Sequence, residues 1–183
     1  MNYAHPDRVQ ALGGGSYNKW FATTRHVGES VTFDDCVDQE KIEGEIDYVV
    51  GASMLVTKKF INKIGMMNEE YFLYFEELDW SVRAQHDFSL AYAANSLVFH
   101  KEGQSIGSSP QSNKKSIVSD YYGVRNRFIF TKKYYRWAIV TVYLSAIGII
   151  CNRIFRRQWE RIPLLLNAIF RPQIIRWKGA DHD

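Results

Sequence analysis

At 183 residues, with 46% hydrophobic and 15% aromatic side chains, the chain has the length and composition of one globular domain with a proper core. Its two cysteines are too few for a disulfide framework, which indicates a reducing compartment, and its first residues lack the charged and apolar stretches of a secretory signal. The net charge of +3 is unevenly spread: residues 1–120 carry 11 basic and 17 acidic side chains, whereas residues 121–183 carry 12 and 3. The C-terminal third is therefore expected to face an anionic partner, either nucleic acid or anionic lipid.

The first part of the chain is expected to be irregular up to residue 46, because "LGGGS" is flexible and "DDCVDQEKIEGE" is polar and acidic. The first strong element is residues 48–56, a short apolar segment typical of a buried strand. Its Gly-Ala-Ser step, which begins at Gly51, removes bulk, so another backbone or a ligand can approach there. A short helix is predicted in "KKFINKIG", ending at Gly65.

The segment "YFLYFEELDWSVRA", residues 71–84, crowds Glu76, Glu77 and Asp79 among aromatic side chains. Apolar residues three and four apart predict a helix that begins near Phe75. The acids then lie in its first turn, where free N–H groups and the helix dipole favour negative charge.

The remaining elements follow from apolar runs and turn residues. "LAYAANSLVFH" predicts one or two strands around Asn95, with His100 at the end of the second, and residues 101–115 form a polar loop. A helix is expected from about Lys115 to Lys133. An apolar run over residues 137–151 and a mixed basic and apolar segment complete the chain.

The chain resembles the inverting, nucleotide-sugar-dependent glycosyltransferases of family 2, which have the GT-A fold, in three successive segments: "DYVVGASMLVTKKFINKIGMMNEEYFLYFEELDWSVRA", "AYAANSLVFHKEG" and "YYGVRNRFIF". It shares their Gly-Ala-Ser strand, the acid pair before a helix, Arg-Ala within that helix and the histidine at a strand end. Among these enzymes it is most similar to the bacterial rhamnosyltransferases of O-antigen and capsule assembly. The resemblance runs from about Tyr3 to Lys133.

The resemblance implies an α/β fold in two parts. Residues 1–133 would form part of a GT-A sheet, the Rossmann-like sheet of nucleotide-diphospho-sugar transferases, and residues 134–183 would form basic, apolar, membrane-associated helices. Only the acceptor half of the family is recognised, so we expect an N-terminally truncated enzyme that needs a donor half for catalysis. A non-catalytic, membrane-associated remnant or interaction module is the alternative.

For catalysis, the resemblance implies that Glu77 is the general base, which takes the acceptor hydroxyl proton as that oxygen attacks the anomeric carbon with inversion. The family usually has aspartate here, and the extra methylene of glutamate moves the carboxylate by roughly an ångström. An ordinary solvated first-turn glutamate is the alternative. Asp79 is the second candidate for the base, although it can equally form an i to i+4 pair with Arg83. Acceptor binding is assigned to Glu76, Trp80, Gly51 and Ala52.

On the donor side, the resemblance makes His100 a ligand of a divalent metal, Mg²⁺ or Mn²⁺; capping of a strand or a phosphate contact are the alternatives. Arg125 and Arg127 are expected near the donor diphosphate, whose oxygens suit guanidinium groups. A basic helix face near a membrane is the alternative for both. The implied donor is a nucleotide sugar such as dTDP-rhamnose, and the implied acceptor is a lipid-linked saccharide.

The apolar run over residues 137–151 is shorter than the ~20 residues that span a bilayer. Shallow insertion at a membrane surface is therefore favoured, with a true span and a buried core helix as alternatives. The run is flanked by aromatic and basic residues, as interfacial anchors are: Tyr134, Tyr135, Arg136, Arg153, Arg156 and Arg157. No nucleic-acid-binding motif accompanies the basic residues. The predicted location is the cytoplasmic face of an inner membrane.

Overall fold

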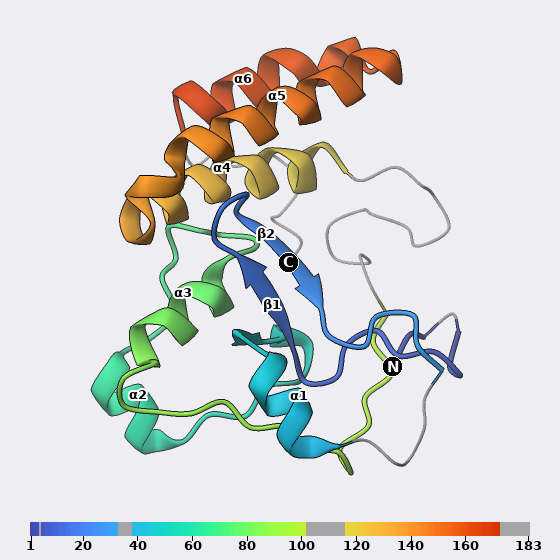
Figure 1. The fold of residues 1–183 in the computed structure, drawn as a ribbon, viewed down its shortest axis with the longest axis vertical. Helices are drawn as coiled ribbons and strands as arrows, with labels where there is room; N and C mark the ends of the chain where they lie inside the picture. Colours follow the sequence, from blue (N-terminus) through green and yellow to red (C-terminus); the bar gives the residue numbers. More distant parts are fainter. Residues whose placement is uncertain (4, 33–37, 102–115, 173–183) are drawn as a thin grey trace, which may run out of the picture.

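The computed structural model describes residues 1–3, 5–32, 38–101 and 116–172. Three helices, α4 to α6, stack at one end of the molecule, and a small sheet with helices α1 to α3 lies on the other side of α4 (Figure 1). The described chain is thus mixed α/β, as predicted. The polar loop predicted after residue 101 lies almost wholly outside the described residues, as does the end of the basic C-terminal segment.

The sheet has three antiparallel strands, β1 (Gly14–Asn18), β2 (Thr23–His26) and β3 (Tyr48–Val49), in the order β2-β1-β3. β1 and β2 form a hairpin, and β1 also pairs with β3. The prediction of irregular structure up to residue 46 is therefore wrong. The glycines of "LGGGS" allow β1 and β3 to approach each other closely. A Cβ at Gly15 would lie only 2.6 Å from the Tyr48 hydroxyl.

The acidic segment before residue 46 is also ordered. It forms helix α1 (Gln39–Glu45), where a loop was predicted. The Asp38 carboxylate caps this helix by accepting a hydrogen bond from the Lys41 N–H at 3.1 Å.

The strand predicted over residues 48–56 is much shorter than expected. Only Tyr48 and Val49 pair, a 3₁₀ turn follows at Gly51–Ser53, and Leu55 is 97% exposed. Pairing ends because the partner strand starts at Gly14, after a left-handed Gly13. The helix predicted next is confirmed as α2 (Lys58–Ile64), with Gly65 at its C-terminus.

Residues 90–100, all of them described, form no strand, which corrects the prediction of one or two. The chain turns at Ala93–Ser96, and His100 makes only an isolated parallel bridge with Asn2. Apolar residues with β propensity are not sufficient here, since a strand needs a neighbour to pair with. Residues 47–100 consequently supply only β3 to the sheet.

The helices match the predictions best. α3 (Glu76–Ala84) begins where expected, and α4 (Ile117–Tyr134) lies within two residues of its predicted ends. α5 (Ile139–Phe155) contains most of the apolar run, and α6 (Ile162–Phe170) folds back beside it. Short 3₁₀ turns precede both, at Arg136–Ala138 and Trp159–Arg161.

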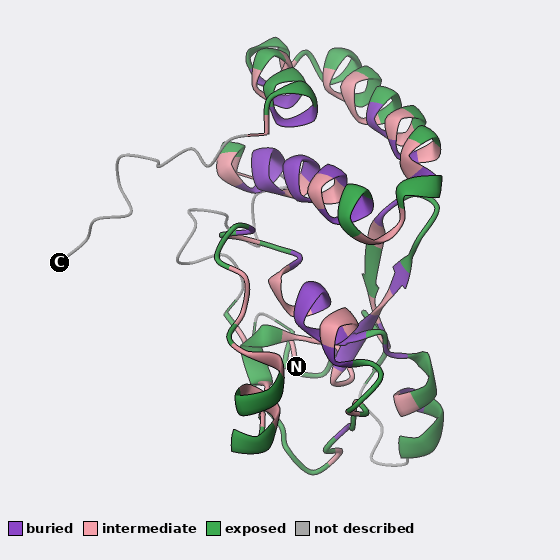
Figure 2. Cartoon of the chain, turned by 90° about the vertical axis from the view of Figure 1, so that its left-hand side faces the viewer, coloured by how far each residue is buried: buried purple, intermediate pink, exposed green. Residues whose placement is uncertain are grey.

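The core lies on both sides of α4, which has buried residues around most of its circumference (Figure 2). Toward the sheet and α3 it packs aromatic side chains, with Phe130 against Tyr17 and Phe75 at 5.2 and 5.4 Å between ring centroids. Toward α5 and the turn before α6, Asp120 forms ion pairs with Arg153, at 2.7 Å, and with Arg161. α4 therefore joins the acidic segment to the apolar helices.

Candidate active site

The acids of α3 are delivered by a strained loop. Phe72, Tyr74 and Phe75 are non-glycine residues with φ of 60°, 67° and 74°, in the left-handed region. Such backbone persists only when its surroundings hold it. The Asn126 side-chain amide of α4 does so, because its Nδ2 group lies 2.7–2.9 Å from three carbonyl oxygens of this loop, those of Tyr71, Leu73 and Tyr74.

Arg125 supports the same loop from the neighbouring position. Its guanidinium donates to the Glu70 carbonyl at 2.8 Å and to the Asn126 side-chain oxygen at 2.7 Å, and the residue is only 2% exposed. Arg125 and Asn126 together fix the segment from which α3 starts. In this structure the Arg125 guanidinium thus binds protein groups, the Glu70 carbonyl and the Asn126 side chain.

Asp79 is fully buried and is the centre of an ion-pair cluster. Its carboxylate accepts from Lys133 and Tyr134 at 2.7 Å, from Arg83 at 2.8 Å and from Tyr71 at 3.2 Å. Burial raises its pKa, but the hydrogen bonds from Lys133, Tyr134 and Arg83 outweigh burial and hold the pKa below its ordinary value. The i to i+4 pair with Arg83 is confirmed, and the carboxylate is saturated with donors.

Glu77 has a different environment in the same helical turn. Its carboxylate lies against the backbone of Gly51, so closely that a Cβ there would collide with it. Burial raises the pKa of Glu77, while a hydrogen bond from the Gly51 backbone and the nearby charge of His26 lower it, with burial the largest effect. No salt bridge ties Glu77 to a cation among the described residues.

Glu76 is the third acid of this turn, and its pKa is raised well above the ordinary value of a glutamate. Burial, followed by the charge of Glu77, raises its pKa to about 7. One of its carboxylate oxygens, Oε2, is buried without a hydrogen-bond partner in the part of the chain that the structure describes. A protonated Glu76 removes part of the repulsion that would otherwise act on Glu77.

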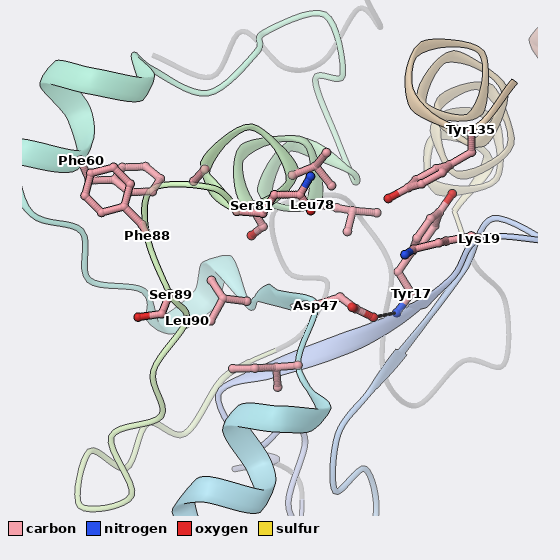
Figure 3. A pocket seen from close by; sticks show the side chains of 14 residues that line it. Tyr17, Lys19, Asp47, Phe60, Leu78, Ser81, Phe88, Ser89, Leu90 and Tyr135 are labelled. Atoms are coloured by element: carbon pink, nitrogen blue, oxygen red, sulfur yellow. Dashed lines mark hydrogen bonds between the residues drawn. The ribbon is translucent and has the colours of Figure 1, made fainter.

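A cavity of about 220 Å³ lies between α3, the sheet and the segment after α3 (Figure 3). Leu78 and Ser81 line it from α3, and Asp47 lines it from beside the sheet. Lys19 and Tyr135 lie at one end, where the Lys19 ammonium is 5.6 Å from the Tyr135 ring centroid. Glu77 adjoins Leu78 in sequence but does not line the cavity.

The sequence-assigned residues do not all converge. Glu77 and Gly51 are in contact, and Ala52 is exposed beside them. Trp80 is buried, with its ring N–H bonded to the Gly65 carbonyl at 2.9 Å and its ring edge-to-face with Phe60, so it attaches α2 to α3.

Of the residues that the sequence assigned to the donor, Arg127 is half-buried, and burial lowers its pKa. It has no anionic partner among the described residues. His100 lies near the start of the chain, with its Nδ1 3.2 Å from Gln10 Oε1. The described residues contain no group of three His, Cys, Asp or Glu side chains that could hold a metal.

Sequence reasoning missed two contributors to the site. Asn126 stands within the quoted segment "YYGVRNRFIF", but only the neighbouring arginines were assigned a role there. His26 gave no signal, because β2 itself was not recognised and its approach to Glu77 depends on the hairpin.

The comparisons with known proteins point in one direction. The low-salt glycan biosynthesis hexosyltransferase Agl10 of Haloferax volcanii is 23% identical to this chain over 128 residues, which are 68% of this chain and 40% of the relative. The similarity supports a relationship to glycosyltransferases. The chain thus corresponds to less than half the length of this relative. No family model matches the chain, and no solved structure matches it.

Proposed function

We propose that this chain is the acceptor-side part of an inverting glycosyltransferase with a GT-A-type fold. The proposed donor is a nucleotide sugar, dTDP-rhamnose being the first to test, and the acceptor is a lipid-linked saccharide of O-antigen or capsule synthesis. The observation that carries the proposal is the Glu77 carboxylate, held against Gly51 at the first turn of α3 and free of ion pairs among the described residues. The similarity to a hexosyltransferase supports the reaction class.

In the proposed reaction, Glu77 accepts the proton of an acceptor hydroxyl while that oxygen forms a bond to the anomeric carbon. The bond from the anomeric carbon to the nucleoside diphosphate breaks, and the diphosphate leaves with the electron pair. Glu77 suits this role better than Asp79, because four donors already occupy the Asp79 carboxylate and an ion-paired carboxylate is a weaker base.

For the donor, Arg127 is the better-placed of the two arginines, since its guanidinium has no described anionic partner whereas Arg125 is bound to the loop before α3. We propose that Arg127 contacts the diphosphate. His100 remains a proposed ligand of Mg²⁺ or Mn²⁺, but the described residues around it do not form a metal site, so no step of the reaction is derived through a metal.

We also propose that the protein works at the cytoplasmic face of an inner membrane. By length and composition, the helical segment of residues 136–155 could cross a membrane. Only 17% of its most apolar part is buried within the protein. A lipid-linked acceptor would then be presented at the same surface.

The experiment is a transfer assay with labelled nucleotide sugars and a lipid-linked saccharide, using the chain fused to the donor-binding half of a homologous glycosyltransferase. We expect transfer, and we expect Gly51→Ala to reduce it on the order of 10²-fold, because the new Cβ displaces the Glu77 carboxylate. Gly44→Ala is the matched control, since its Cβ meets nothing within 4 Å. Absence of transfer with every donor would favour the non-catalytic membrane module.

A further inference from the structure

One side of α5 is apolar and faces solvent along the whole helix. Most of its exposed apolar residues are three or four positions apart, so they form a single stripe. α6 lies beside α5 and exposes Leu166 and Phe170, and exposed residues run along the outer side of both helices (Figure 2). An apolar surface of this extent is unusual on a monomeric soluble protein. The stripe consists of Trp137, Val140, Leu144, Ile147, Cys151, Ile154 and Phe155.

The turn between β1 and β2 extends this surface. Trp20 lies edge-to-face on Trp137, with ring centroids 4.6 Å apart, and the Thr141 hydroxyl donates a hydrogen bond to the Trp20 carbonyl. Trp20 and Phe21 are nevertheless 56% and 48% exposed. The hairpin therefore brings two large apolar side chains to the N-terminal end of the α5 stripe.

The charged residues around this apolar surface indicate which kind of partner binds to it. Among the described residues at its edge, Glu160 is the one exposed acid. Tryptophan and arginine at the two ends of an apolar stripe are typical of the interface between lipid headgroups and hydrocarbon, and basic residues attract anionic lipid. The exposed basic residues at the edge are Lys19, Arg136, Arg156, Arg157 and Arg171.

The packing of α5 fixes its orientation. Its inner side, with Val142 and Ala146 buried, lies on α4, and Arg153 near its end is ion-paired to Asp120 of α4 at 2.7 Å. Besides its apolar residues, α4 carries buried polar and charged side chains, among them Asp120, Arg125 and Asn126. If α5 crossed the bilayer in this fold, these groups would enter hydrocarbon, which is costly.

We propose that the α5 stripe, the outer side of α6 and the β1–β2 turn form one surface that lies flat in the headgroup region of an anionic bilayer. This rests on the membrane association proposed above and adds its orientation and a second contact, at Trp20 and Phe21. The acids of α3 then remain in the aqueous phase, on the side of α4 away from the lipid.

The orientation is tested with nitroxide labels on the full chain, bound to phosphatidylcholine vesicles with phosphatidylglycerol. Cys151 is exposed and can be labelled once Cys36, outside the described residues, is changed to serine. Labels at Val140→Cys, Leu144→Cys and Ile147→Cys are placed in a chain without other cysteines. We expect similar, shallow depths at all four positions, measured from oxygen and nickel accessibility.

A spanning helix would give a different pattern, because each residue rises 1.5 Å and positions 140 and 151 would differ in depth by about 16 Å. That gradient would overturn the proposal. Labels shielded from lipid, in a chain that sediments as an oligomer, would also overturn it by showing that a second copy covers the stripe. Vesicle binding is measured without any sugar, so a negative result leaves the proposed transfer reaction untouched.

The second contact is tested with Trp20→Ala/Phe21→Ala, for which we expect a loss of vesicle affinity on the order of tenfold. Leu97→Ala/Phe99→Ala is the matched control, since these residues are similarly exposed but belong to the segment beside the N-terminus, which lies away from α5 (Figure 1). Should the first variant not fold, Arg156→Glu/Arg157→Glu, which alters only exposed charges, must weaken binding to the anionic vesicles at low salt. Wild-type affinity in the folded variants would contradict the proposal.

Discussion

Three carboxylates in the first turn of α3 have three different surroundings. Asp79 is buried among cations and hydroxyls, Glu76 is partly buried with one carboxylate oxygen that has no described partner, and Glu77 lies against a glycine backbone. Position in the helix does not separate them, since all three share the same turn. The elements that each side chain faces decide its protonation and its availability for chemistry.

For Asp79, the structure predicts a role in stability. Asp79→Asn should lower the free energy of unfolding by about 3 kcal/mol, because it removes the fully buried counter-charge of Lys133 and Arg83. Asp87→Asn removes an exposed pair with Lys63 and should cost below about 1 kcal/mol. Urea unfolding of both variants measures the difference, and equal losses would refute the assignment.

For Glu76, the structure predicts a pH dependence. Its pKa rises from 4.5 to about 7 on folding, so the folded state binds the proton more tightly. Its contribution to stability is therefore present below pH 4.5 and is lost as the pH rises through about 7. The free energy of unfolding, measured with urea, should fall between pH 5 and pH 7.5 by an amount on the order of 2 kcal/mol. Glu76→Gln should flatten this fall; a parallel pH profile in the variant would show that another group titrates.

For single residues, the sequence predicted the contacts between positions that are close together in the chain. The acids in the first turn and the pair of Asp79 with Arg83 follow from helical spacing alone. The contacts of Asp79 with Lys133 and Tyr134 join positions more than fifty residues apart, and no local pattern encodes them. The approach of Glu77 to Gly51 is likewise a tertiary contact.

Between elements, α4 acts as the support of the acid-bearing helix. It holds the loop before α3 through Asn126 and holds α3 itself through Lys133 and Tyr134. Positions 126 and 133 are two helical turns apart, so both contacts lie on one face of α4. The strained loop and the α3 acids are therefore fixed to the same rigid element.

This arrangement predicts that Asn126→Asp, which keeps the shape of the side chain but removes its N–H donors, releases the loop. We expect a loss of about 2–4 kcal/mol in the free energy of unfolding, because buried carbonyls lose their donor and a carboxylate is buried beside them. Hydrogen exchange at residues 71–75 should accelerate. Asn62→Asp, on the exposed face of α2, is the control and should change neither quantity. Unchanged exchange in Asn126→Asp would show that the loop is held by other contacts.

The sequence predicted the positions of three helices well and those of the strands poorly, for a physical reason. Helices α2, α3 and α4 were predicted to within a few residues, because helical hydrogen bonds and caps are local. The strands were not, because residues 48–56 and 90–100 have β-forming composition but little to pair with in the described chain, while the glycine-rich β1 pairs on both sides.

Across the whole molecule, α4 separates a polar site from an apolar surface. The acids of α3 lie on one side of it and the exposed stripe of α5 on the other (Figure 1). The sequence indicated both features, through the acid cluster and the apolar run, but it did not predict that they lie on opposite sides of α4. A lipid-linked acceptor held at such a bilayer surface would need to extend its saccharide past α4 to reach Glu77.

The most direct test of the central claim is the turnover of Glu77→Gln in the chain joined to a donor-binding half, with saturating donor and acceptor. Glutamine keeps the size and hydrogen bonding of the side chain but cannot accept the proton, so turnover should fall by roughly 10²–10⁴-fold. Binding of the sugar nucleotide should stay nearly unchanged, and so should the free energy of unfolding. Near-normal turnover in Glu77→Gln, with activity abolished in folded Asp79→Asn, would contradict the account and assign the base to Asp79.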